Sequence, residues 1–326
     1  MSQEKTDSLS MNAASRNGRR AGALAAPARR PLGWGRLRAF VERESVFSWL
    51  MLTPPLLFLL LFLGYPFFYG VYLSFFHKEV ARAASFVGFG NFVKLYNDPI
   101  FWQAVRNTII FTGVATILKA SGGLGMALVM NQNFKMKSFA RAMLLLPFIV
   151  PTVLSTVAWQ WILDPGMGLF NRMLVVSGLA TTGPSWLGTP TMAMISIIMV
   201  NTWRGLPFFG ISILAGLQTI PVDLHESATI DGAGTWGRFR YVTLPSLLPV
   251  IFIVTTFSIV ITFFDFQLVY VLTGGGPANS THLMATYAYS LSMGAGQMGL
   301  GSAVALSMVP VLGLLLVLLT LYVRKD

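Results

Sequence analysis

The sequence has no cysteine among its 326 residues. It can therefore form no disulfide, and thiolate catalysis and cysteine-based metal sites are excluded. The histidines His77, His225 and His282 fall in separate segments, and none completes an H-E-x-x-H motif. The pattern G-x-x-x-x-G-K-[ST] is also missing, which excludes ATP binding by a P-loop. The sequence thus offers no enzyme chemistry of these kinds.

Charge is scarce and hydrophobic residues are abundant. Charged residues make up 11% of the chain, against about 25% in soluble domains, and the mean hydropathy is +0.66. Several charge-free runs exceed the roughly 20 residues that a helix needs to cross the hydrocarbon, and they lack the alternation of barrel strands. We therefore expect an all-α polytopic membrane protein. Its six expected spans are at about 47–72, 104–130, 140–163, 190–217, 245–272 and 302–323.

The N-terminal stretch differs from the rest of the chain. Residues 1–44 hold nine Lys or Arg against four acids and have little apolar content, a composition typical of disorder. We expect a disordered basic cytoplasmic tail over 1–45 and a transmembrane domain over 46–326, with its core at 103–323. The positive charge is explained by the membrane topology, and we do not expect nucleic-acid binding.

The orientation follows from counting Lys and Arg in the connecting segments. If the N-terminus lies in the cytoplasm, the inner segments hold 16 of these residues and the outer segments hold 5. Cytoplasmic loops are richer in positive charge, so both termini are predicted to be cytoplasmic. The tail supplies most of this difference.

A polar stretch at residues 221–244, between the fourth and fifth spans, is longer than a passive connector requires. Asp223 can cap a short helix, and Gly232 can end it because glycine adopts a positive φ at little cost. Asp223 and Glu226 would then lie near the positive end of the helix dipole. These features predict an ordered helical hairpin at the membrane surface.

The order of residues in this hairpin is specific. It reads Glu226-x-Ala228-x-x-Asp231-Gly232-Ala233, followed by Leu244-Pro245. This pattern resembles the cytoplasmic "EAA" loop of permease subunits of bacterial ABC importers, with Ser227 where alanine is commoner. The resemblance implies a coupling helix that docks into a cleft of an ATP-hydrolysing subunit through Glu226, Ser227, Ala228, Asp231, Gly232 and Ala233.

Further motifs extend the resemblance over residues 60–323. They include Tyr65-Pro66, Arg106-Asn107-Thr108, Asp164-Pro165, Trp203-Arg204-Gly205-Leu206-Pro207 and Thr273-Gly274-Gly275-Gly276-Pro277. Together they are similar to carbohydrate-type permeases with the type I ABC importer fold. The resemblance implies import of a sugar or oligosaccharide, or of a polyol or glycerol phosphate, across the bacterial inner membrane.

The same resemblance implies an assembly. This chain would pair with a second permease, a dimer of ATP-binding subunits and an extracytoplasmic solute-binding protein, all organised around the lipid bilayer. ATP and magnesium would be bound by the partner subunits, so we expect no cofactor and no catalytic residue in this chain.

Three charged residues, Lys119, Arg204 and Asp265, fall well inside the expected spans, away from their ends, where charge is costly and marks functional sites. Carboxylates and amides hydrogen-bond hydroxyl groups, and aromatic rings pack on sugar rings. A substrate path is therefore expected along Asn201, Trp203, Asp265, Gln267 and Tyr270. The alternative is a structural contact between helices, such as an ion pair of Asp265 with Arg204.

Two other functions remain compatible with the sequence. A permease of an ABC importer for a non-sugar solute would carry a similar loop. A secondary transporter driven by an ion gradient would function alone, and it would be expected to place several acids within its spans.

Overall fold

The structure is a computed structural model that describes residues 44–323. The tail expected over 1–45 falls almost entirely outside this range. The chain divides into two units, residues 1–63 and 64–326. In the first unit, helix α2 (Glu44–Leu59) passes through Pro54 and Pro55, and a π-helical turn, η1 (Leu60–Gly64), follows it. Proline lacks the backbone N–H and leaves a helix carbonyl without its usual donor. An irregular turn such as a π-helical turn can accommodate this loss.

The second unit is almost entirely helical. Its first half contains α3 (Tyr65–Ser74), a hairpin of β1 (Phe76–His77) with β2 (Ser85–Phe86), α4 (Gly90–Tyr96), α5 (Pro99–Asn131), α6 (Lys137–Ile149), α7 (Thr152–Ile162) and α8 (Leu169–Val176). Its second half contains α9 (Pro190–Leu217), α10 (Val222–Ile230), α11 (Thr235–Arg238), η2 (Phe239–Thr243), α12 (Leu244–Phe263), α13 (Gln267–Leu272), α14 (Met284–Tyr289), η3 (Ser290–Gly294) and α15 (Met298–Val323).

Five helical segments are long and apolar enough to cross a membrane, at Phe47–Ser74, Pro99–Asn131, Pro190–Leu217, Thr235–Phe263 and Met298–Leu321. A sixth exists if the bent pair of α6 and α7 counts as one span. The all-α polytopic fold predicted from the sequence is confirmed.

The expected third span, 140–163, is not one straight helix. It is divided into α6 and α7, which meet at an angle of 96°. Pro151 lies at the junction, and a residue before proline avoids helical backbone angles. The side chain of Gln160 then holds α7 against α13, because its Nε2 donates to the carbonyl oxygen of Val271 at 2.5 Å.

The expected fifth span is also interrupted. Helix α12 ends at Phe263 and α13 begins at Gln267, so the chain leaves the helix around Asp265. Asp265 Oδ1 accepts a hydrogen bond from the backbone N–H of Leu268 at 3.3 Å. The carboxylate thus satisfies a donor that the new helix would otherwise leave without a partner.

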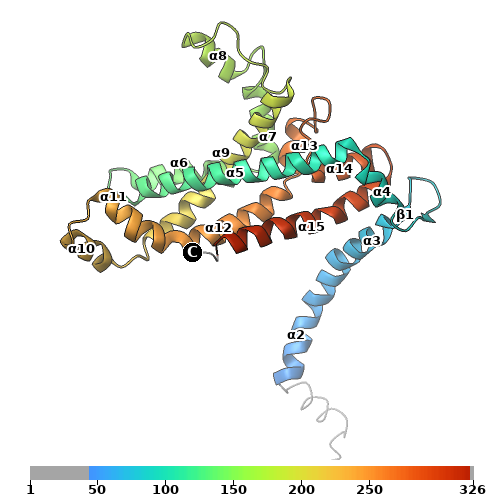
Figure 1. Cartoon of the computed structure of the whole chain (residues 1–326), viewed down its shortest axis with the longest axis horizontal. Helices are drawn as coiled ribbons and strands as arrows, with labels where there is room; N and C mark the ends of the chain where they lie inside the picture. The colour runs from blue at the N-terminus through green and yellow to red at the C-terminus, as the bar shows by residue number, and fades with distance from the viewer. Residues whose placement is uncertain (1–43, 324–326) are drawn as a thin grey trace, which may run out of the picture. The chain divides into compact units, whose positions relative to one another are not determined.

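Helices α5 and α9 run side by side along the centre of the second unit (Figure 1). Gly123 permits their close approach, because a Cβ at this position would lie 3.1 Å from the backbone of Phe209 and Gly210. Small residues are common where membrane helices pack closely. Phe111 and Ile197 are buried in the same packed core, together with Leu268 of α13.

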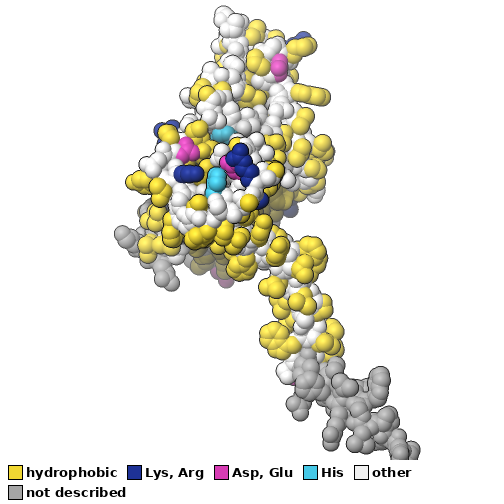
Figure 2. Space-filling view, turned by 90° about the vertical axis from the view of Figure 1, so that its right-hand side faces the viewer, with side chains coloured by type: hydrophobic (Ala, Val, Ile, Leu, Met, Phe, Trp, Pro, Cys, Tyr) yellow, Lys and Arg dark blue, Asp and Glu magenta, His cyan; other side chains and the backbone are white. Residues whose placement is uncertain are grey.

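One end of the second unit carries α4, the β-hairpin and α14, and the other end carries α10 and α11 (Figure 1). We call these the α14 end and the α10 end. Figure 2 looks onto the α14 end, where charged side chains gather on the end face while hydrophobic side chains dominate around it. A polar end and apolar flanks are expected of a bundle whose long axis crosses a bilayer.

Side chains of α5 organise the α14 end. Asn107 Nδ2 donates to the carbonyl oxygens of Ser280 and His282, at 2.8 and 3.1 Å. Asp98 caps α5 by accepting from Ile100 N at 2.9 Å, and it also accepts from the hydroxyl of Tyr287. Burial and this bond raise the pKa of Tyr287, whereas burial lowers the pKa of His282.

A glycine substitution tests the α5–α9 contact. We expect Gly123→Ala to lower the stability of the purified chain by about 1–3 kcal/mol, because the added methyl group displaces the α9 backbone. Gly125→Ala is the matched control, because a Cβ there meets nothing within 4 Å. Thermal unfolding in detergent measures both variants, and equal melting temperatures would contradict the close packing.

Candidate functional site: a helical hairpin and a polar cavity

Helix α10 and the turn that follows it carry the residues that the sequence assigned to coupling. The helix begins at Val222 after Pro221, so Asp223 lies in its first turn. The expectation that Asp223 is the capping residue was wrong. Pro221 at the N-cap position has a fixed backbone angle, and Asp223 still lies in the first turn, near the positive end of the helix dipole.

The end of α10 is built as predicted. Gly232 has φ of +83°, a left-handed conformation that favours glycine. Its N–H donates to the carbonyl of Thr229 at 3.0 Å, and the N–H of Ala233 donates to that of Ala228 at 2.9 Å. This pair of bonds is a Schellman motif. Gly232 therefore sets the direction in which the chain leaves α10.

The predicted coupling residues divide into two groups by exposure. Glu226, Ser227, Asp231 and Gly232 are exposed, whereas Ala228 and Ala233 are half-buried. Their small size therefore also serves packing within the hairpin, since Ala233 Cβ lies 3.4 Å from where a Cβ at Gly237 would be. Arg238 of α11 braces the hairpin by donating to Thr229 Oγ1 at 3.3 Å.

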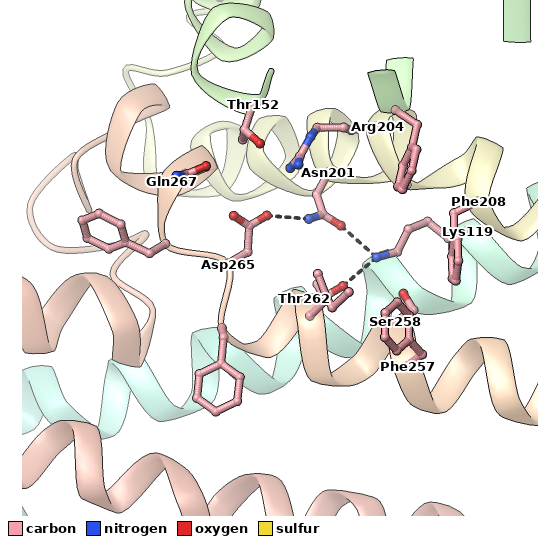
Figure 3. Close-up of a pocket in the computed structure, with 15 residues that line it drawn as sticks. Lys119, Thr152, Asn201, Arg204, Phe208, Phe257, Ser258, Thr262, Asp265 and Gln267 are labelled. Carbon is pink, nitrogen blue, oxygen red and sulfur yellow. Dashed lines mark hydrogen bonds between the residues drawn. The ribbon is translucent and has the colours of Figure 1, made fainter. Parts of the chain in front are cut away.

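A second feature is a cavity of about 320 Å³ among α5, α6, α7, α9 and the α12–α13 junction. Its walls combine aromatic rings with polar groups (Figure 3). The lining residues include Lys119, Phe148, Thr152, Asn201, Arg204, Phe208, Phe257, Ser258, Thr262, Asp265 and Gln267.

A chain of hydrogen bonds crosses this cavity (Figure 3). Lys119 Nζ donates to Asn201 Oδ1 at 3.0 Å and to Thr262 Oγ1 at 2.7 Å. Asn201 Nδ2 donates to Asp265 Oδ2 at 2.8 Å. The amide thus lies between the ammonium and the carboxylate, with its oxygen toward the cation and its nitrogen toward the anion. Lys119 is only 3% exposed, so this arrangement compensates a charge that apolar surroundings would strongly disfavour.

The ion pair that the sequence suggested between Asp265 and Arg204 is not what the structure contains. Within residues 44–323, Asp265 receives its side-chain hydrogen bond from Asn201. Arg204 lines the same cavity, and its buried Nε has no partner among the described residues. A guanidinium and a carboxylate that are not paired with each other remain available to polar groups of a bound solute.

The structure brings together part of the expected substrate path. Asn201, Asp265 and Gln267 line the cavity. Trp203 and Tyr270 lie outside this lining. Trp203 packs edge-on against Trp159, with 5.4 Å between ring centroids, and Tyr270 stacks on Phe266 at 4.9 Å.

Sequence reasoning missed several cavity residues. Phe148, Phe208 and Phe257 form a cluster, with 6.1 Å between the first two ring centroids and 5.5 Å between the last two. Thr262 completes the bonding of Lys119. Phenylalanine and threonine are common in membrane helices, so these residue types did not indicate a cavity. Lys119 was the one indication in the sequence, because a cation inside the membrane requires a hydrogen-bond partner.

Comparison with known proteins places the chain in a family. Residues 119–325 match the family described as the binding-protein-dependent transport system inner membrane component. The chain belongs to this family. It is therefore a multi-pass membrane permease subunit, and the matched residues include both the hairpin and the whole cavity lining.

Relatives of this permease are known from archaea and bacteria. It is 35% identical over 266 residues to the trehalose/maltose transport system permease protein MalF of Thermococcus litoralis, covering 81% of this chain and 89% of that protein. It is 34% identical over 267 residues to the sulfoquinovosyl glycerol transport system permease protein SmoG of Agrobacterium fabrum, covering 81% and 86%.

The permease fold is shared with a solved structure. A chain of a bacterial ABC transporter that imports the acidic polysaccharide alginate superposes with a TM-score of 0.75. The superposition covers 89% of this chain and 99% of that one, at 23% sequence identity. This likeness confirms the ABC importer permease fold.

The hydrogen-bond chain predicts coupling between its two charges. We expect Lys119→Met to lower the stability of the purified chain by about 1–3 kcal/mol, because it leaves buried acceptors without a donor. Adding Asp265→Asn should restore part of this loss, because the carboxylate then no longer needs compensation.

Thermal unfolding of the two single variants and the double variant measures this coupling. Lys94→Met is the control, since Lys94 is an exposed lysine of α4. Additive losses from Lys119→Met and Asp265→Asn would contradict the network.

Proposed function

We propose that this chain is one of two permeases in an ATP-driven, binding-protein-dependent importer of a sugar or oligosaccharide. The observation that carries the proposal is the exposed hairpin of α10, with its glycine-terminated helix, in a permease whose relatives include a trehalose/maltose and a sulfoquinovosyl glycerol permease. The second permease, an ATP-binding subunit dimer and a solute-binding protein complete the assembly. A polyol or glycerol phosphate is the next solute class.

The proposed orientation puts the α10 end and both termini in the cytoplasm of a bacterial inner membrane. The excess of Lys and Arg in the N-terminal tail and in the segments at the α10 end supports this orientation. The coupling role requires the same orientation, because ATP is available only in the cytoplasm.

In this proposal α10 transmits force from the ATP-binding subunits. Glu226 of α10 and Asp231, just after its end, are exposed and can hydrogen-bond or pair with a docked subunit. Closure of the ATP-binding dimer would move the hairpin, and α12 continues from it through α11 and η2. The dimer must bind the hairpin differently in its open and closed states, since only differential binding shifts a conformational equilibrium.

The cavity is proposed as this chain's part of the solute path. The amides of Asn201 and Gln267, the carboxylate of Asp265 and the guanidinium of Arg204 can hydrogen-bond sugar hydroxyls. Phe208 and Phe257 supply faces for the apolar sides of a sugar ring. The second permease would close the path on its other side.

The chain itself is proposed to be non-catalytic, with no cofactor of its own. ATP hydrolysis and magnesium binding belong to the partner subunits.

A permease for a non-sugar solute remains the alternative, and uptake assays with the purified solute-binding protein distinguish it. A secondary transporter is less well supported, because Asp265, between α12 and α13, is the one acid among the described residues that line the cavity. ATP-independent uptake by the chain alone would favour it.

The turn after α10 tests coupling. We expect Gly232→Pro to abolish transport by the reconstituted importer, because proline cannot adopt the positive φ and lacks the N–H that bonds to Thr229. Gly232→Ala should weaken coupling by several-fold, since the strain of a left-handed alanine is on the order of 1 kcal/mol. ATP hydrolysis and solute uptake, measured in parallel, report the coupling.

Gly234→Ala is the matched control, because Gly234 has φ of −67° and a Cβ there meets open space. Normal coupled transport by Gly232→Pro would exclude this mechanism. Loss of transport in Glu226→Gln, with the complex still assembled, would place Glu226 at the contact.

The absence of cysteine makes the orientation directly testable. We expect Asn133→Cys, in the exposed α5–α6 connection, to resist a membrane-impermeant maleimide in spheroplasts and to react in inverted vesicles. Ala83→Cys, in the exposed β1–β2 connection, should behave in the opposite way. The reverse pattern would overturn the orientation.

A further inference from the structure

A second concave site lies toward the α10 end, between α5, α6 and α9. It is a groove of about 310 Å³. Most of its wall is apolar, and its polar groups are Arg141 and Gln218. The residues that matter here are Met126, Met130, Arg141, Leu144, Ile211 and Gln218.

Arg141 in this groove is an uncompensated cation. Its Nε is buried and has no hydrogen-bond partner among residues 44–323. The helices that form the groove, α5, α6 and α9, contain no Asp or Glu. Lys137 lies one turn earlier on the same face of α6, so a second positive charge adds to the field. The groove therefore attracts an anion, and its three helices provide no acidic side chain to act as one.

The rest of the groove selects what kind of anion fits. Met126, Met130, Leu144 and Ile211 present flexible apolar surface, which a small hydrated anion would not use. An amphiphile with an anionic head and an alkyl chain satisfies both parts. Basic pockets between membrane helices at the cytoplasmic side are the sites where anionic lipid head groups bind.

We propose that this groove is a binding site for an anionic phospholipid of the inner leaflet. The phosphate accepts hydrogen bonds from Arg141 and Gln218, and an acyl chain lies along Met126, Met130 and Ile211. The assignment to the inner leaflet rests on the orientation proposed above, which the cysteine-labelling experiment tests separately. The bound lipid would secure α6 against α9, next to the cavity.

The test uses the complete importer reconstituted in nanodiscs that contain equal parts of phosphatidylglycerol and phosphatidylcholine. After detergent extraction, the retained lipid is quantified by native mass spectrometry. We expect Arg141→Gln to lower the retained phosphatidylglycerol roughly fivefold and to leave phosphatidylcholine unchanged, since one cation near the surface contributes about that factor.

Lys135→Gln is the matched control, because Lys135 is an exposed lysine of the α5–α6 connection, just before α6 and outside the groove. Ala215→Phe is the second variant. Ala215 lines the groove, so the larger side chain should fill it and expel the lipid while Arg141 stays in place.

Equal losses in Arg141→Gln and Lys135→Gln would overturn the proposal, because they would indicate general surface attraction. Undiminished retention in both Arg141→Gln and Ala215→Phe would also overturn it. A photoreactive residue at Ala215 should cross-link to lipid. Cross-linking to the second permease or to the ATP-binding subunit instead would show a protein interface and reject the lipid site.

Discussion

The hydrocarbon of a bilayer offers no hydrogen-bond partners, so every break in a membrane helix must be satisfied from within the protein. This constraint explains the positions of several polar side chains. Asp265 accepts from Leu268 N where α12 gives way to α13, and Gln160 Nε2 binds the carbonyl of Val271 near the end of α13. Asn107 binds the carbonyls of Ser280 and His282 in the turn that follows. Gln160 and Asn107 lie on the regular helices α7 and α5, so side chains of neighbouring helices hold the irregular segments in place.

Helix α12 connects the hairpin to the cavity. The chain passes from the Schellman turn at Gly232 through α11 and η2 into α12, and α12 ends beside Asp265. Helix α12 packs against α5 and α9, whereas α13, beyond the break at Asp265, packs against α7. In the proposed mechanism, motion of the hairpin would reach the cavity through α12, which carries the lining residues Phe257, Ser258 and Thr262. Thr262 bonds to Lys119 of α5, and Asp265, beyond the end of α12, bonds to Asn201 of α9.

The sequence was sufficient for the helical membrane fold, the turn at Gly232 and the family. A glycine just after a short polar helix is typical of a helix-ending turn with positive φ. Long apolar runs are typical of membrane-spanning helices. The break of the third span at Pro151 and the interruption at Asp265 were not predicted, because hydropathy measures composition and not backbone direction. Lys119 was recognised as costly, but its partners lie 82 and 143 residues away, and single-sequence patterns carry no information on such distances. The cavity of Phe148, Phe208 and Phe257 was missed for the same reason.

The sequence left two alternatives for the buried charges, a structural contact between helices and a role in the solute path. The geometry is compatible with both. Asn201 separates the ammonium of Lys119 from the carboxylate of Asp265, so neither charge is consumed by a direct ion pair. The amide contacts both groups, and Asp265 and Arg204 line the cavity without a direct ion pair between them. A direct Lys–Asp pair would be stronger electrostatically but would leave less for a solute to bind. The neutral amide of Asn201 thus links the helices through hydrogen bonds and leaves polar groups in the cavity. A path for a hydroxylated solute would require such polar groups.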